Sequence, residues 1–156
     1  MKKLVLFMAI LPLVALTSCG DDEEESGFSS DVKAVIQTLN GTWVSTDAIS
    51  PETLTFSAFA SPKEIAPASN SFARMEFHGS MTRDFIYLGK ETEQWDLYFY
   101  VNTDKKEIHA YGKSEENDGW SLSISKVYDY TIVDANTITL HDQSLSWMNT
   151  YTFKRK

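Results

Sequence analysis

The chain has 156 residues with 14 basic and 22 acidic side chains, so its formal charge at pH 7 is −8. A surface of this sign repels phosphate backbones and anionic lipid head groups, which argues against nucleic-acid binding and against electrostatic attachment to membranes. The single cysteine excludes an intramolecular disulfide.

The first eighteen residues have the form of a secretory signal. Lys2 and Lys3 precede an apolar run over residues 4–16, which is shorter than the roughly 20 residues of a membrane-spanning helix. The run ends in Leu16-Thr17-Ser18-Cys19, which resembles the lipobox of bacterial lipoproteins. That resemblance implies cleavage before Cys19 and acylation of this cysteine, palmitate included, so that lipid holds the protein on a membrane.

The segment behind the cysteine is strongly acidic. Five consecutive carboxylates, Asp21 to Glu25, predict an extended and solvated tether over residues 20–27. Their position also resembles the export signal that sends some Gram-negative lipoproteins to the outer face of the outer membrane. We therefore expect an outer-membrane protein displayed at the cell surface, the alternative being a simple spacer with the domain facing the periplasm.

Three segments follow from these features. Residues 1–18 are the signal peptide, residues 19–27 are the lipidated cysteine with its tether, and residues 28–156 form one domain. The domain opens with a helix predicted over residues 30–39, because Val32, Val35, Ile36 and Leu39 recur at helical spacing. Ser29 or Ser30 can cap its start, and the dipeptide at 40–41 marks its end.

The rest of the domain has the alternation of half-buried strands. Nine runs rich in Thr, Val, Ile and aromatic residues are separated by short polar turns, which predicts antiparallel neighbours. The runs cover residues 42–46, 53–59, 72–78, 81–88, 93–102, 107–112, 120–133, 137–141 and 146–154. Because an open sheet leaves unpaired edges, we expect an all-β antiparallel meander that closes into a barrel of about 8–10 strands.

Two segments leave alternatives open. Residues 60–71, with Pro62 and Pro67, predict a long crossover loop, and a lid is the alternative. The run from Trp120 to Val133 is long for one strand; a bulge near Lys126 would keep it single, whereas two strands would give a ten-stranded barrel.

The start of the first strand carries a second resemblance. Leu39-Asn40-Gly41-Thr42-Trp43 follows a short helix and is similar to the Gly-x-Trp segment of lipocalins and of lipocalin-like domains in small bacterial lipoproteins. The resemblance implies that Trp43 packs across the closed end of the barrel, under a cation from Lys154 or Arg155.

No catalytic signature, nucleotide loop or available nucleophilic cysteine is present, so we expect neither enzymatic activity nor a cofactor. The histidines at 78, 109 and 141 lie on three different strands, and their spacing predicts no metal site.

We expect the barrel to bind a small apolar or amphipathic ligand through its apolar face. The candidate lining residues are Trp43, Met75, Phe77, Trp95, Phe99, Trp120, Trp147 and Tyr151. The same residues would fill a solid core. The alternative function is therefore a surface interaction module that contacts a protein or glycan partner through loops or through an outward pair, Tyr98 and Tyr100.

Overall fold

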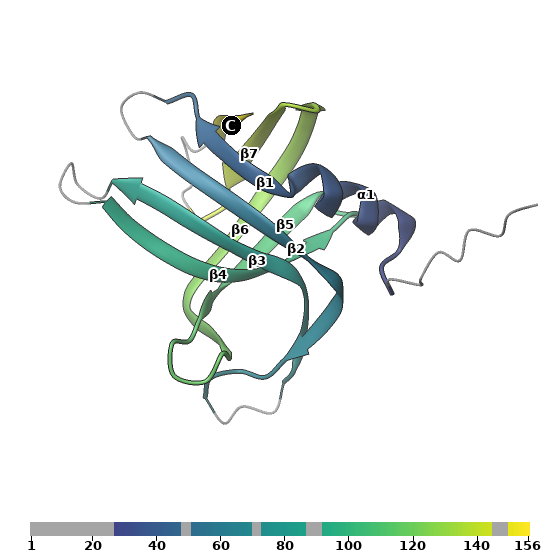
Figure 1. Cartoon of the computed structure of the whole chain (residues 1–156), viewed down its shortest axis with the longest axis vertical. Coiled ribbons are helices and arrows are strands. Elements are labelled where there is room, and N and C mark those ends of the chain that lie inside the picture. The colour runs from purple at the N-terminus through teal and green to yellow at the C-terminus, as the bar shows by residue number, and fades with distance from the viewer. Residues whose placement is uncertain (1–26, 48–50, 70–72, 87–91, 145–149) are drawn as a thin grey trace, which may run out of the picture.

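One helix and eight antiparallel strands make up the structure, a computed structural model that describes residues 27–47, 51–69, 73–86, 92–144 and 150–156 (Figure 1). The elements are α1 (Ser30–Leu39), β1 (Gly41–Ser45), β2 (Glu52–Ile65), β3 (Met75–Ile86), β4 (Thr92–Asn102), β5 (Glu107–Lys113), β6 (Trp120–Asp134), β7 (Thr137–Asp142) and β8 (Thr150–Arg155). Each strand pairs with the next, and β1 also pairs with β8, which closes the sheet. The predicted meander barrel with one short helix is confirmed.

The strand count settles at eight because two predicted runs belong to one strand. Residues 75–86 continue through Gly79 and Ser80 as β3, and the predicted parts at residues 72, 87–88 and 146–149 lie outside the described residues. The long run from Trp120 is also a single strand, β6.

β6 stays single because it contains a bulge. Ser121 pairs with Gly112 and Ser125 pairs with Tyr111, so residues 122–124 are extra on the β6 side. A side chain at position 112 would bring its Cβ within 3.3 Å of Ile124 Cβ, and the glycine therefore makes room for the bulge. The bulge lies just before Lys126, where the sequence predicted it.

The near end of the barrel, where β1 begins, is closed by α1. Ser29 caps the helix by accepting a hydrogen bond from the Val32 N–H, as predicted. Ile36 and Leu39 are the buried residues of the helix, and both belong to the core inside the barrel. We call the opposite end, where β2, β4, β6 and β8 begin, the far end.

Trp43 fills the near end. Its side chain is fully buried, and its Nε1 donates a hydrogen bond of 2.6 Å to the Leu39 carbonyl. The Arg155 guanidinium lies 4.3 Å from the ring centre and donates to the carbonyls of Asn40 and Thr38. The predicted cation over Trp43 is thus Arg155.

Gly41 is required beside this cap. Its φ is +119°, and a Cβ there would lie 2.9 Å from Arg155 Nη1. A side chain would therefore be strained and would also push Arg155 away from Trp43.

β2 and β3 are longer than their neighbours and bend over the outside of the barrel. Ala58 pairs with Gly79 and Lys63 pairs with Phe77, so residues 59–62 of β2 stand opposite His78 alone. Beyond this bend, residues 63–65 and 75–77 form a two-stranded arm, which curves along the lower part of Figure 1. The arm ends in Ala66 and Ala68, whose backbone groups hydrogen bond to Trp120.

The arm covers an outer aromatic cluster between itself and the outer face of β4 and β5. Its buried members are Phe77, Tyr98 and Trp120, and its partly buried members are Phe59, Ile65, Met75, Tyr100 and Tyr111. Two predictions are corrected here. Residues 60–65 are strand rather than loop, and Tyr98 faces out from the barrel but is only 7% exposed beneath the arm.

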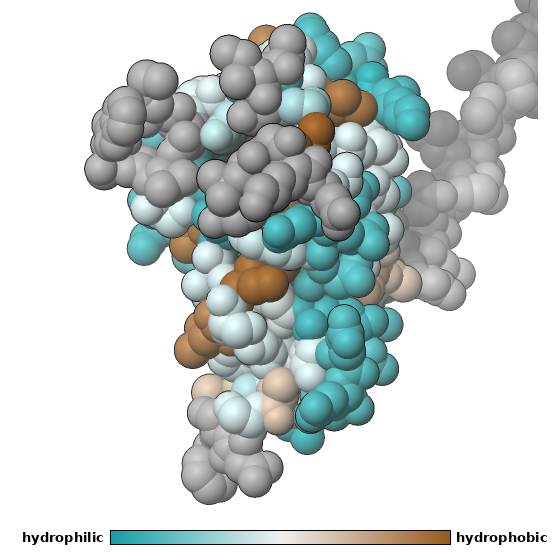
Figure 2. Space-filling model, turned by 90° about the vertical axis from the view of Figure 1, so that its left-hand side faces the viewer, coloured by the Kyte–Doolittle hydropathy of each residue, from teal (hydrophilic) through white to brown (hydrophobic). Residues whose placement is uncertain are grey.

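The outer surface carries only scattered apolar side chains. The exposed large hydrophobic residues among those described are Ile86, Leu122, Ile132 and Val133. Figure 2 shows one face of the molecule, where hydrophobic spots are separate within a mainly hydrophilic surface. In the described part of the chain, no helix has the length and apolar character needed to cross a membrane.

Candidate functional site: a polar layer at the far end of the barrel

The interior of the barrel changes character along its axis. Toward the near end and the middle it holds apolar side chains such as Leu54, Phe99 and Ile138. Toward the far end, the same alternation places charged and polar side chains inside. We call this set the far-end polar layer, and its members are Glu52, Arg83, Lys126, Tyr128 and Asp142.

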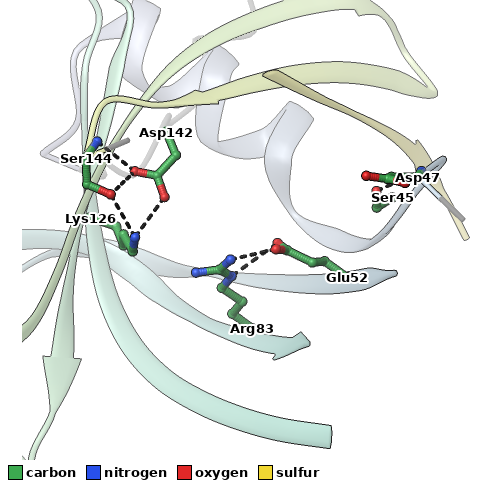
Figure 3. A network of polar contacts seen from close by, with 7 residues as sticks. All are labelled: Ser45, Asp47, Glu52, Arg83, Lys126, Asp142 and Ser144. Atoms are coloured by element: carbon green, nitrogen blue, oxygen red, sulfur yellow. Dashed lines mark hydrogen bonds and ion pairs between the residues drawn. The ribbon is translucent and has the colours of Figure 1, made fainter. Parts of the chain in front are cut away.

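Arg83 and Glu52 form the central ion pair of the layer. Arg83 Nε lies 3.1 Å from Glu52 Oε2, and Nη2 lies 2.6 Å from Oε1, so the contact is bidentate (Figure 3). Their side chains are only 11% and 9% exposed. Burial alone would lower the pKa of Arg83, but the hydrogen bond and charge of Glu52 outweigh it and raise that pKa. The Arg83 guanidinium is therefore charged in this contact.

Two aromatic rings flank the guanidinium of Arg83. Its Cζ lies 4.7 Å from the centre of the Phe85 ring and 5.2 Å from the centre of the Trp95 ring. The two rings meet edge to face at 4.7 Å. Cation–π contact of this kind fixes the guanidinium while leaving its edges available for hydrogen bonds.

Two polar groups in the layer have no hydrogen-bond partner among the described residues. Arg83 uses Nε and Nη2 on Glu52, and no hydrogen bond joins its Nη1 to a described residue. Among the described residues, Tyr128 Oη is the fully buried side-chain polar atom without any hydrogen-bond partner. Burial raises the pKa of Tyr128, so the phenol is neutral and keeps its proton.

Lys126, Asp142 and Ser144 form a second polar group, drawn apart from the central ion pair in Figure 3. Lys126 Nζ donates to Asp142 Oδ2 at 2.8 Å and to Ser144 Oγ at 2.9 Å. The Asp142 Oδ1 atom accepts from the backbone N–H and the hydroxyl of Ser144. Burial alone would raise the pKa of Asp142, but the bonds from Lys126 and Ser144 lower it overall.

The layer is electrically balanced. Arg83 is neutralised by Glu52, and Lys126 is neutralised by Asp142. What the layer offers chemically is therefore hydrogen-bond donors beside aromatic rings, rather than a free charge. No group of three or more His, Cys, Asp or Glu residues suited to a metal ion occurs among the described residues.

The predicted lining residues divide between three places. Trp43 and Phe99 are fully buried in the core of the barrel. Met75, Phe77 and Trp120 belong to the outer aromatic cluster. Trp95 and Tyr151 are partly buried and pack against the core; Trp95 also flanks Arg83. Trp147, like Cys19, lies outside the described residues. The structure therefore does not bring the predicted lining together into one surface.

The predicted lining does not include the far-end polar layer, because that prediction rests on aromatic residues and the layer is formed mainly by charged ones. The alternation of inward and outward residues along the strands does indicate this layer. Arg83 follows Met81 and precedes Phe85 on the apolar face of β3, and Glu52 shares the inward face of β2 with Leu54 and Phe56. A charged side chain at an inward position is the pattern that would have identified the layer.

Grooves formed by described residues also lie outside the barrel. One, of about 410 Å³, runs between the arm and the end of β4 and is lined by Met75, Glu76, His78, Tyr100, Val101, Asn102 and Thr103. A second, of about 400 Å³, lies beside Trp120 and Leu122. A third, of about 300 Å³, lies beside Asp96 and Lys113.

The chain was compared with known proteins in three ways. A scan against protein-family models, a search of curated proteins and a search of solved structures each returned no significant match.

Proposed function

We propose that this protein is a lipid-anchored, non-catalytic lipoprotein whose barrel binds a small amphipathic ligand at the far end. The observation that carries the proposal is the far-end polar layer, with its unpartnered Tyr128 hydroxyl above an apolar interior. The polar part of the ligand would meet Arg83 and Tyr128, and its apolar part would lie against Trp95 and Phe85.

The energetics of burial support a ligand over a purely structural layer. A buried polar group without a partner costs about 1–3 kcal/mol, and apolar residues of the same size would avoid that cost. Tyr128 carries this penalty at 5% exposure, while Phe would fill the same space. A ligand acceptor would remove the penalty, which gives the hydroxyl a reason to be there.

The anchoring part of the proposal rests on Cys19 and on the direction in which the chain meets the barrel. Residues 27–29 lead into α1, and α1 covers the near end. A tether attached at Cys19 would therefore reach the barrel at α1, and the far end would be the end opposite the attachment. Display on the cell surface would then leave the far end accessible.

Acylation is tested with the full-length gene expressed in a Gram-negative host. Metabolic labelling with an alkyne analogue of palmitate should label the wild-type protein and leave the Cys19→Ser variant unlabelled. Protease treatment of intact cells tests the location, because a surface protein is degraded and a periplasm-facing one survives. Equal labelling of both variants would contradict lipidation at Cys19.

Ligand binding is tested by native mass spectrometry of the lipoprotein purified from host membranes in mild detergent. We expect the wild type to carry a small-molecule adduct and the Tyr128→Phe variant to carry less of it. Tyr130→Phe is the matched control, because Tyr130 is also buried two residues further along β6. No adduct on the wild type, and none after incubation with a total lipid extract, would argue against the proposal.

One observation favours the alternative, a module that contacts a partner from outside. The groove of about 410 Å³ beside the arm combines the ring of Tyr100 with exposed polar groups such as Glu76. A glycan or an extended peptide would fit such a groove. If Glu76→Lys abolishes adhesion of the purified protein to a glycan or protein array while Tyr128→Phe has no effect, the alternative is favoured.

A further inference from the structure

Two groups in the far-end polar layer have hydrogen-bonding capacity left open among the described residues. Arg83 Nη1 carries donors only, whereas the neutral Tyr128 phenol can donate its proton or accept a hydrogen bond. The oxygens of Glu52 and Asp142 are already engaged by Arg83, Lys126 and Ser144. A ligand group that bonds to both Arg83 Nη1 and Tyr128 therefore has to supply an acceptor, because Arg83 can only donate.

The charge of the layer is already balanced before any ligand arrives. Each buried cation has its own carboxylate at 2.6–2.8 Å, Glu52 for Arg83 and Asp142 for Lys126. An anionic ligand would add an uncompensated negative charge or displace Glu52, which would then be buried without its partner.

A cationic ligand fits no better. The carboxylates that would attract it are occupied by Arg83 and Lys126. An ammonium group could donate to Tyr128 Oη, but it would also meet the like charge of the Arg83 guanidinium and leave Nη1 without an acceptor. The aromatic rings beside Arg83, Phe85 and Trp95, are already in cation–π contact with its guanidinium.

We infer that the polar group of the ligand is uncharged and accepts hydrogen bonds, as a carboxamide, ester or hydroxyl does, and that the layer discriminates against carboxylates and amines. This inference rests on the proposed ligand-binding function and specifies its ligand class. The balanced ion pairs act as the selectivity device: they hold Arg83 in position and remove the charge that would otherwise capture an anion.

The test uses three probes that share one alkyl chain and differ only in the head: hexanamide, hexanoate and hexylamine. The full-length lipoprotein is placed in lipid nanodiscs, and Kd is measured by isothermal titration calorimetry at pH 7, with empty nanodiscs as the blank. Burying an uncompensated charge is strongly unfavourable, so we expect hexanamide to bind at least ~10-fold tighter than either charged probe.

The variant Glu52→Gln sharpens the test because it keeps the shape of the side chain and releases the charge of Arg83. We expect hexanoate to become the best of the three probes on this variant. Tyr128→Phe should weaken hexanamide about fivefold, the equivalent of one neutral hydrogen bond, and Tyr130→Phe should leave it unchanged. If Glu52→Gln does not fold by circular dichroism, the Tyr128→Phe pair still tests the inference.

The outcomes separate the inference from the function on which it depends. Hexanoate or hexylamine binding to the wild type as tightly as hexanamide would overturn the inference and leave ligand binding intact. Failure of every probe, together with an absence of co-purified ligand, would overturn both.

Discussion

The two ends of the barrel are formed by the same strands, but their inward-facing residues differ in polarity. On β2 the inward residues change from Phe56 and Leu54 to Glu52, and on β7 they change from Ile138 and Leu140 to Asp142. The near end is closed by fully buried side chains, while the far end holds ion pairs and an unpartnered hydroxyl. Under the function proposed above, the near end stabilises the fold and the far end keeps polar groups for the ligand.

Trp43→Ala should have the largest effect and should mark the near end as the stabilising half. Truncation of a fully buried Trp costs about 3–5 kcal/mol, and here it also removes the ring beneath Arg155. Urea unfolding followed by circular dichroism gives the free energy of unfolding. Trp95→Ala is the far-end control and should lose less, because Trp95 is only partly buried. Equal losses would contradict the assignment of stability to the near end.

Arg83→Met should cost about 3 kcal/mol, because it leaves the buried Glu52 carboxylate without its partner. The double variant Arg83→Met with Glu52→Leu removes both charges and should recover most of that loss. Thermal or urea unfolding of the wild type, Arg83→Met, Glu52→Leu and the double variant completes the double-mutant cycle. A double variant as unstable as Arg83→Met alone would mean that the ion pair itself stabilises the fold and does not serve only to hold the Arg83 donors in position.

Asp142→Asn should alter how stability depends on pH. The folded-state pKa of Asp142 lies below its ordinary value of 3.8, so its contribution is present above that pH and is lost as the pH falls through the folded pKa. At pH 7 we expect a loss of about 1–3 kcal/mol, the range for a charged hydrogen bond, and a flatter acid limb. Burial lowers the pKa of His78 from 6.5, so protonation of His78 also reduces stability as the pH falls, but at a higher pH than protonation of Asp142. This contribution is the same in the wild type and in Asp142→Asn. An unchanged acid limb in the variant would contradict this assignment.

The near end was predictable because one physical rule governs it. Helical spacing in residues 30–39 and strict alternation in the strands follow from the burial of apolar faces, and both predictions were confirmed. The cation over Trp43 was also predicted to come from one of two neighbouring basic residues, and Arg155 fills that position.

The arm and the far end were harder to predict, for two physical reasons. Pro62, Pro67 and small residues indicate a loop. The Trp120 N–H donates to the Ala66 carbonyl and the Ala68 N–H donates to the Trp120 carbonyl, and together with the aromatic cover over Tyr98 these bonds keep residues 60–65 extended. These contacts join segments about 50 residues apart, which local patterns cannot encode. At the far end, local sequence cannot show whether a charged residue on the apolar face of a strand is buried, because burial depends on an ion-pair partner on another strand.

Tyr128→Phe tests the comparison most directly, because its two expected effects have opposite signs. At the near end, the polar atom of the buried Trp43 side chain has a hydrogen-bond partner. Tyr128 at the far end differs, because it is only 5% exposed and its hydroxyl has no partner among the described residues. Deleting the hydroxyl removes a desolvation penalty, so the free energy of unfolding should rise by about 1 kcal/mol. Tyr130→Phe, at 7% exposure on the same strand, is the matched control and should change stability less. Urea midpoints of the ligand-free proteins measure the first effect, and the hexanamide Kd measures the second. A variant that gains stability while losing affinity would identify Tyr128 as a binding residue that destabilises the fold. A loss of stability would mean that the hydroxyl does have a hydrogen-bond partner and that buried polar groups are paired at the far end as they are at the near end.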